Sequence, residues 1–187
     1  ALARTLLTAF GAFADLSRHL RYSRIRLLQL GTGIGESNVA GSGGGEPSVR
    51  IRGVSHPALF SQPPSELGYA LTLPSNSIVS SWCALSPEVW EKVEHGVTFE
   101  LSVERTGQVS SARLQLDPRR RLLDRRWRYL ALRVPFEGKV RVVLKTTAAA
   151  GASEQKTWAL WGDPRVEFRR SVAGTGEAAR RAIVTRG

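Results

Sequence analysis

The sequence predicts an all-β protein, a jelly-roll-like β-sandwich of about eight strands that carries an amphipathic helical extension at its N-terminus. Two observations lead to this prediction. Short apolar runs separated by turn residues fill residues 67–168, and no stretch of helical period interrupts them. The length of 187 residues, 42% of them apolar, suits one such domain and a modest extension.

Residues 1–30 are predicted to form a basic amphipathic helix. Their apolar side chains recur at helical spacing, and basic residues gather from Arg18 onward. Such a helix suits docking on a partner protein or on a membrane surface, with Leu6, Phe10 and Phe13 as the candidate contacts. The alternative is an ordinary helix that packs its apolar stripe on the sandwich.

Residues 31–48 are rich in glycine and serine and are predicted to form a linker or a long surface loop. Gly31 and Gly33 follow an apolar run, as in a dinucleotide-binding fingerprint. Glu36, however, occupies the place of the third glycine, and no alternation of strands and helices follows. The sequence therefore argues against a nucleotide-binding fold here.

From residue 49 the period of the pattern changes to two, and residues 49–170 are predicted to form the β-sandwich domain. The cleanest alternation places Val97, Phe99, Leu101 and Val103 on one face. Strands are expected at residues 49–52, 67–73, 78–85, 97–103, 108–116, 127–134, 139–146 and 157–168. The basic tail, residues 171–187, is expected to wrap the surface or to fray.

The net charge of +11, supplied mostly by arginine, suits an anionic partner. An anionic membrane surface, an acidic protein and nucleic acid all fit a basic surface, and so does a solvated surface without a partner.

The residue types that catalysis and metal binding require do not form a recognisable motif in this sequence. Cys83 is the single cysteine and sits in an apolar run, so we expect a buried and inert thiol. His19, His56 and His95 lack metal-ligand spacing and a catalytic order. The prediction is a protein that is not an enzyme and that holds no cofactor and no metal.

Strand signatures along the sandwich carry a family resemblance. They are Leu67-Gly-Tyr-Ala-Leu-Thr-Leu-Pro74, Trp82 to Trp90, Gly96-Val-Thr-Phe-Glu-Leu-Ser-Val103, Leu116-Asp-Pro118, Arg126-Trp127 and Trp158-Ala-Leu-Trp-Gly-Asp-Pro-Arg165. This succession resembles a β-sandwich module of bacterial surface and membrane-associated proteins, similar to galactose-binding-like and NPCBM-type jelly rolls. The resemblance covers about 100 residues and concerns the fold more than the ligand. It implies a non-catalytic role, carbohydrate binding among the options.

A dense positive cluster precedes Trp127. Its candidate partner-binding residues are Arg119, Arg120, Arg121, Arg125 and Arg126. Such a loop suits acidic side chains of a partner subunit or the phosphates of lipid headgroups. Nucleic acid ranks below these partners, because no RNA-recognition aromatic signature and no helix-turn-helix accompanies the cluster.

Trp90 is the candidate sugar-binding residue. It follows the Ser86-Pro87 turn and neighbours charged residues, which favours an exposed ring. The other tryptophans lie inside strand runs, where a core position is expected.

Together these patterns predict a non-catalytic accessory or structural subunit of a larger, membrane-associated bacterial assembly. It would bind through the N-terminal helix and the arginine-rich loop, peripherally at the membrane and in a periplasmic or extracytoplasmic location. The alternative is a carbohydrate-binding β-sandwich module.

Overall fold

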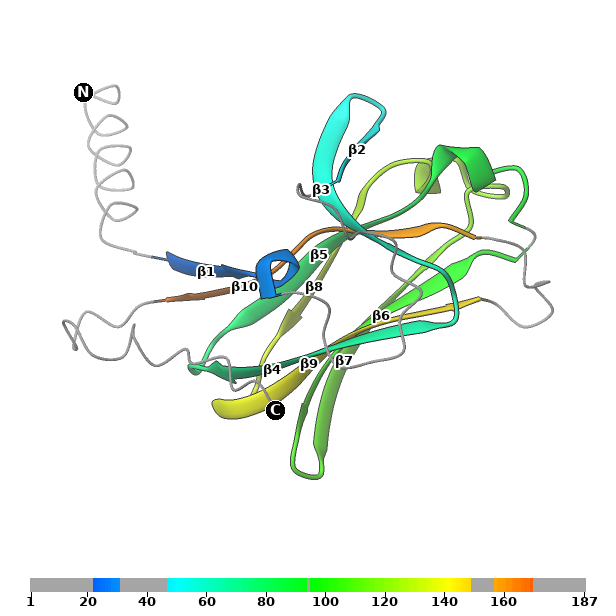
Figure 1. Cartoon of the computed structure of the whole chain (residues 1–187). Helices are drawn as coiled ribbons and strands as arrows, with labels where there is room; N and C mark the ends of the chain where they lie inside the picture. The colour runs from blue at the N-terminus through cyan, green and yellow to red at the C-terminus, as the bar shows by residue number, and fades with distance from the viewer. Residues whose placement is uncertain (1–21, 31–46, 94, 149–156, 170–187) are drawn as a thin grey trace, which may run out of the picture.

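Two antiparallel sheets pack face to face in the computed structural model, which describes residues 22–30, 47–93, 95–148 and 157–169 (Figure 1). The predicted all-β sandwich is confirmed. The six-stranded sheet runs in the order β2 (Ser48–Ile51), β3 (Val54–Ser61), β10 (Ala159–Arg169), β5 (Ile78–Leu85) and β8 (Arg128–Arg133), with β1 (Tyr22–Arg26) also paired to β10. The four-stranded sheet runs β4 (Ser65–Leu73), β9 (Gly138–Ala148), β6 (Val97–Arg105) and β7 (Gln108–Leu116).

Short 3₁₀ turns connect some of these strands. They are η1 (Leu27–Leu30), η2 (Pro87–Val89) and η3 (Leu122–Asp124). In Figure 1, η2 and η3 lie at one end of the sandwich, and β1 lies at the other.

β10 is the central strand of the six-stranded sheet. One of its edges pairs along its length with β5, and the other edge is shared: Ala159 to Gly162 pair with β3, and Arg165 to Arg169 pair with β1. A bulge between Gly162 and Arg165 separates the two halves. Segments far apart in the sequence are therefore brought together around β10.

The main core fills the space between the sheets. Trp161 of β10 and Phe99 of β6 are fully buried and meet edge-to-face with ring centroids 5.1 Å apart. The predicted inward row on β6, from Val97 to Val103, is buried as expected. Cys83 is also buried, and burial raises the pKa of its thiol well above the usual value, which fits the expected inert thiol.

The predicted N-terminal helix is wrong for residues 22–30, which form β1 and η1 instead. The alternation of Arg24 and Ile25 suits a strand, since Arg24 pairs with Glu167 of β10 at 3.0 Å while Ile25 packs against the core. Leu27 then turns into the core and is fully buried. The remainder of the predicted helix, including Leu6, Phe10 and Phe13, lies outside the described residues, as do residues 31–46 and the tail after residue 169.

The sequence analysis also missed β3, because Pro57 interrupts its pattern. β2 and β3 form a tight hairpin in which Ile51 pairs with Val54. The two loop residues, Arg52 and Gly53, have φ values of 47° and 85°. Positive φ at both positions is the signature of the primed turns that match strand twist.

Candidate functional site

Four aromatic side chains gather on the outer face of the six-stranded sheet, the face turned away from the main core. We call His56, Trp82, Trp127 and Tyr129 the outer aromatic cluster. They come from β3, β5, the residue before β8, and β8 itself. Sheet pairing brings them together: Trp82 lies opposite Tyr129 on one side and opposite Gly162 on the other.

Gly162 makes the close approach of these rings possible. A Cβ atom at this position would lie 2.8 Å from Cζ3 of Trp127 and 3.1 Å from Cβ of His56, closer than packed atoms allow. The missing side chain therefore lets the rings of Trp127 and His56 cross β10.

The ring geometry makes the outer aromatic cluster rigid but leaves part of it open. His56 stacks on Trp82 with centroids 5.1 Å apart, and Trp127 meets His56 edge-on at 5.0 Å. Trp127 is buried, and its indole N–H donates to the carbonyl of Val54 at 3.1 Å. Tyr129, 5.0 Å from Trp82, is 47% exposed, and Trp82 is half-buried. Solvent thus reaches this surface chiefly at Tyr129 and Trp82.

A row of charged side chains lies beside the rings, where β1 pairs with the second half of β10. Glu167 contacts both Arg24 and Arg165 at 3.0 Å. Asp163 pairs with Arg165 and lies 3.8 Å from Arg26. This row offers hydrogen-bond donors and acceptors together, and its positive and negative side chains contact one another.

Two buried polar atoms near the rings have no hydrogen-bond partner within the described part of the chain: His56 Nε2 and Ser80 Oγ. Ser80 lies two residues before Trp82 on β5 and therefore on the same face. Burial lowers the pKa of His56, as does Arg165, while Asp163 opposes the shift. The imidazole is therefore neutral at neutral pH, with one nitrogen as donor and the other as acceptor. Unpartnered groups of this kind suit water or a polar ligand.

Sequence reasoning missed this surface and singled out Trp90. The structure places Trp90 half-buried beside η2, with its N–H donating to the carbonyl of Leu85 at 2.9 Å. The guanidinium of Arg125 lies 5.7 Å from its ring centroid. A sugar contact at Trp90 stays a prediction. The signal for the outer aromatic cluster was Gly162, because an isolated glycine inside a strand often marks a close approach.

The structure brings the predicted arginines together in the loop between β7 and β8, and buried carboxylates organise them. Asp124 accepts a hydrogen bond from the backbone N–H of Asp117 at 2.9 Å and another from Arg128 at 3.1 Å. Further ion pairs join Arg120 to Asp117, Arg121 to Asp124 and Arg125 to Glu91 at 3.8, 3.7 and 2.6 Å. The prediction of a dense positive loop did not include these contacts with Asp117 and Asp124, and partner binding by the arginines stays a prediction.

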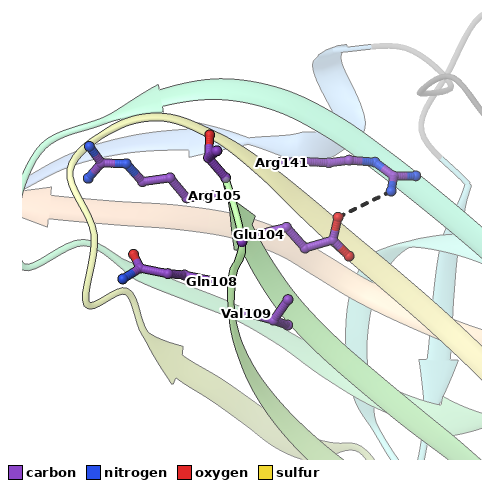
Figure 2. Close-up of a pocket in the computed structure, with 7 residues that line it drawn as sticks. Glu104, Arg105, Gln108, Val109 and Arg141 are labelled. Atoms are coloured by element: carbon purple, nitrogen blue, oxygen red, sulfur yellow. Dashed lines mark hydrogen bonds and ion pairs between the residues drawn. The ribbon is translucent and has the colours of Figure 1, made fainter.

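A shallow hollow of about 370 Å³ lies at the tip of the hairpin between β6 and β7, and Figure 2 shows its lining. Arg141 crosses it to pair with Glu104 at 3.3 Å and with Glu66 at 2.9 Å. Its lining contains no aromatic ring, so it offers less to a sugar than the outer aromatic cluster.

The described residues contain neither a cluster of metal ligands nor a membrane-spanning helix. Within them, no group of three or more histidine, cysteine or acidic side chains converges as metal ligands would. None of the helices placed there is long and apolar enough to cross a membrane.

Comparisons with known proteins define the class of fold. No family model matches the chain. An uncharacterized protein of Archaeoglobus fulgidus is 27% identical over 100 residues, which are 51% of this chain and 25% of that protein. The chain thus spans about a quarter of the length of that relative.

Solved structures of two Clostridium perfringens domains are similar to the chain. The CBM51-2 domain of Clostridium perfringens ZmpB, solved with GlcNAc and with INT domains, has a TM-score of 0.50 at 14% identity, covering 79% of this chain and 32% of that one. The CBM51 of Clostridium perfringens GH95, in complex with methyl-galactose, has a TM-score of 0.49 at 15% identity, covering 77% and 99%. The likeness to the ZmpB domain concerns the fold alone, a β-sandwich, and it confirms the predicted sandwich architecture.

Proposed function

We propose that the chain is a non-catalytic carbohydrate-binding module and that a sugar ring packs on the outer aromatic cluster. The observation that carries this proposal is the partly exposed pair Trp82 and Tyr129, held rigid by His56 and Trp127. A pyranose has an apolar C–H face and a rim of hydroxyl groups. Aromatic side chains suit the face, and a few well-placed polar groups suit the rim.

The polar surroundings support the same ligand class. The charged row of Arg24, Arg165 and Glu167, which is partly exposed, supplies both donors and acceptors, as hydroxyl groups require. The GlcNAc bound to the similarly folded ZmpB domain adds support for a sugar. A glycan ligand also fits an extracytoplasmic location, which stays a prediction.

These features favour the carbohydrate-binding alternative over the accessory-subunit interpretation. The apolar contacts which that interpretation needs, Leu6, Phe10 and Phe13, lie outside the described residues. Of the arginines that it names, Arg120 and Arg121 pair with aspartates of their own loop and Arg125 pairs with Glu91.

The experiment is a glycan array with the intact chain, followed by calorimetry with the sugars that bind. Tyr129→Ala should weaken binding about tenfold or more, because a lost aromatic contact of roughly 1.5 kcal/mol corresponds to about that factor. Tyr129 is substantially exposed, so its removal should leave the fold intact.

Trp90→Ala is the matched control and should bind like the wild type. If Trp90→Ala abolishes binding while Tyr129→Ala does not, the ligand sits at the turn after β5 and the proposed site is wrong. A chain that binds no glycan on the array overturns the function itself.

A further inference from the structure

Two leucines lie exposed at the tip of the loop between β7 and β8. Leu122 and Leu123, the first residues of η3, are 66% and 63% exposed. Single exposed apolar side chains are common on protein surfaces, but two neighbours on one turn form a contiguous apolar spot. The spot lies at the same end of the sandwich as η2 (Figure 1), and the pair of Arg125 with Glu91 joins the two loops.

The loop holds these leucines in place through its own hydrogen bonds. The backbone N–H of Arg121 donates to the carbonyl of Asp117 at 2.8 Å, and that of Asp124 donates to the carbonyl of Arg121 at 2.9 Å. The side chain of Arg125 donates to the carbonyl of Pro118 at 2.7 Å. A closed turn of this kind loses little conformational entropy when its tip is buried in a partner.

The outward charge of the loop is positive. The side chains of Asp117 and Asp124 are only 6% and 4% exposed, because they face the backbone that they cap. The side chains of Arg120 and Arg121 are 68% and 57% exposed. Arg119 and Arg126 are exposed as well and have no ion pair or hydrogen bond among the described residues. The two exposed leucines therefore belong to a loop whose other exposed side chains include four arginines.

We propose that this loop docks on an anionic lipid surface. Leu122 and Leu123 enter the boundary between headgroups and acyl chains, and the exposed arginines of the loop contact lipid phosphates. The combination of the two kinds of group fits such an interface, since apolar side chains can enter the acyl boundary while guanidinium forks bind at the phosphate level. An acidic protein would suit the arginines, but it offers no general reason for an apolar pair in the same loop.

The test is co-sedimentation of the intact chain with vesicles of phosphatidylcholine alone and of phosphatidylcholine mixed with phosphatidylserine. The chain should bind only the anionic vesicles. Leu122→Ser with Leu123→Ser should weaken binding at least about tenfold, as expected from the loss of two inserted side chains. Each of Arg119→Gln and Arg126→Gln should weaken it about fivefold, the effect of one cation near an anionic surface.

Matched controls lie at the hairpin between β6 and β7. Val109→Ser removes an apolar side chain that is 68% exposed, and Arg105→Gln removes an exposed cation. Neither should change vesicle binding. Salt should also act on the wild type: at about 1 M the Debye length is about 3 Å, so binding to the anionic vesicles should fall toward the level seen with neutral vesicles.

Absence of vesicle binding, equal binding to neutral vesicles, or binding that the leucine and arginine variants leave unchanged would each overturn the proposal. The leucine variant should keep the glycan affinity of the wild type, since the outer aromatic cluster is untouched. Failure of the lipid proposal is thereby distinguishable from failure of the proposed function.

Discussion

Asp124 organises the loop between β7 and β8 through contacts that the local sequence does not predict. Its buried carboxylate caps the N–H of Asp117 and pairs with Arg128 and Arg121. Asp124→Ala should lower the free energy of unfolding by about 2–3 kcal/mol, because the buried N–H of Asp117 loses its acceptor and Arg128 loses its ion-pair partner. Urea denaturation measures the change.

The control for Asp124 is Glu91→Gln, in which the side chain is 72% exposed and paired with Arg125. An exposed pair contributes at most about 1 kcal/mol, so this variant should unfold nearly like the wild type. Equal losses in the two variants would show that the buried carboxylate has no special role.

His56 should make the stability of the sandwich depend on pH. Its pKa in the fold is lowered by burial, and the charges of Asp163 and Arg165 partly offset each other. The unfolded chain, with an ordinary histidine pKa of 6.5, therefore takes up the proton first as the pH falls. The stabilisation is complete above that value and is lost as the pH falls toward the folded pKa.

The check compares wild type with His56→Phe by thermal denaturation between about pH 7 and pH 5. Stability of the wild type should fall more steeply on acidification than that of the variant. Parallel curves for the two proteins would mean that His56 titrates alike in both states.

The burial of single residues could be predicted where the local sequence pattern determines it. Contacts between residues of distant strands could not. The inward row on β6 followed from a period-two pattern, and the burial of Cys83 followed from the apolar run around it. The meeting of His56, Trp82 and Tyr129 did not, because three strands must be ordered in one sheet before these residues become neighbours.

β1 and η1 belong to the sandwich rather than to a separable N-terminal segment. Leu27 is fully buried in the main core, whereas Leu28 next to it is only half-buried. Leu27→Ala should lower the free energy of unfolding by about 2–5 kcal/mol through lost burial and a cavity, and Leu28→Ala should have a smaller effect. Chemical denaturation of both variants measures these changes. An unchanged free energy of unfolding in Leu27→Ala would show that residues 22–30 do not contribute to the core.

The prediction of a helix over residues 22–30 failed for a physical reason. Apolar spacing from Leu2 to Leu20 suits a helix, and nothing in that periodicity marks where it stops. Tyr22 begins a strand because a partner, the second half of β10, lies more than a hundred residues away in the sequence. A local pattern cannot report a pairing of that range.

At the scale of the whole molecule, the spacing of the turns was enough to predict a β-sandwich but not the order of its strands. The net charge of +11 indicated anionic partners, yet its distribution depends on which arginines meet carboxylates in the fold. The proposed lipid loop leads directly through Arg126 into Trp127 of the outer aromatic cluster. If both proposals hold, the sugar site would lie close to the bilayer.

The bulge in β10 determines which of the residues after it face the core and which face outward; we call this alternation the parity of the strand. In a regular strand Gly162 would face outward with residue 164, and Arg165 and Glu167 would point into the core. Because two residues, Asp163 and Pro164, share one place opposite Ser81, Arg165 instead joins Gly162 on the outer face and Val166 turns inward.

A chain one residue shorter at this point would reach the same parity without any bulge. What it would lack is the extra position itself, where Asp163 adopts a φ of 42° and contacts Arg165 and Arg26. The additional residue is therefore not required for the packing of the core, and its contribution is to the charged row on the outer face.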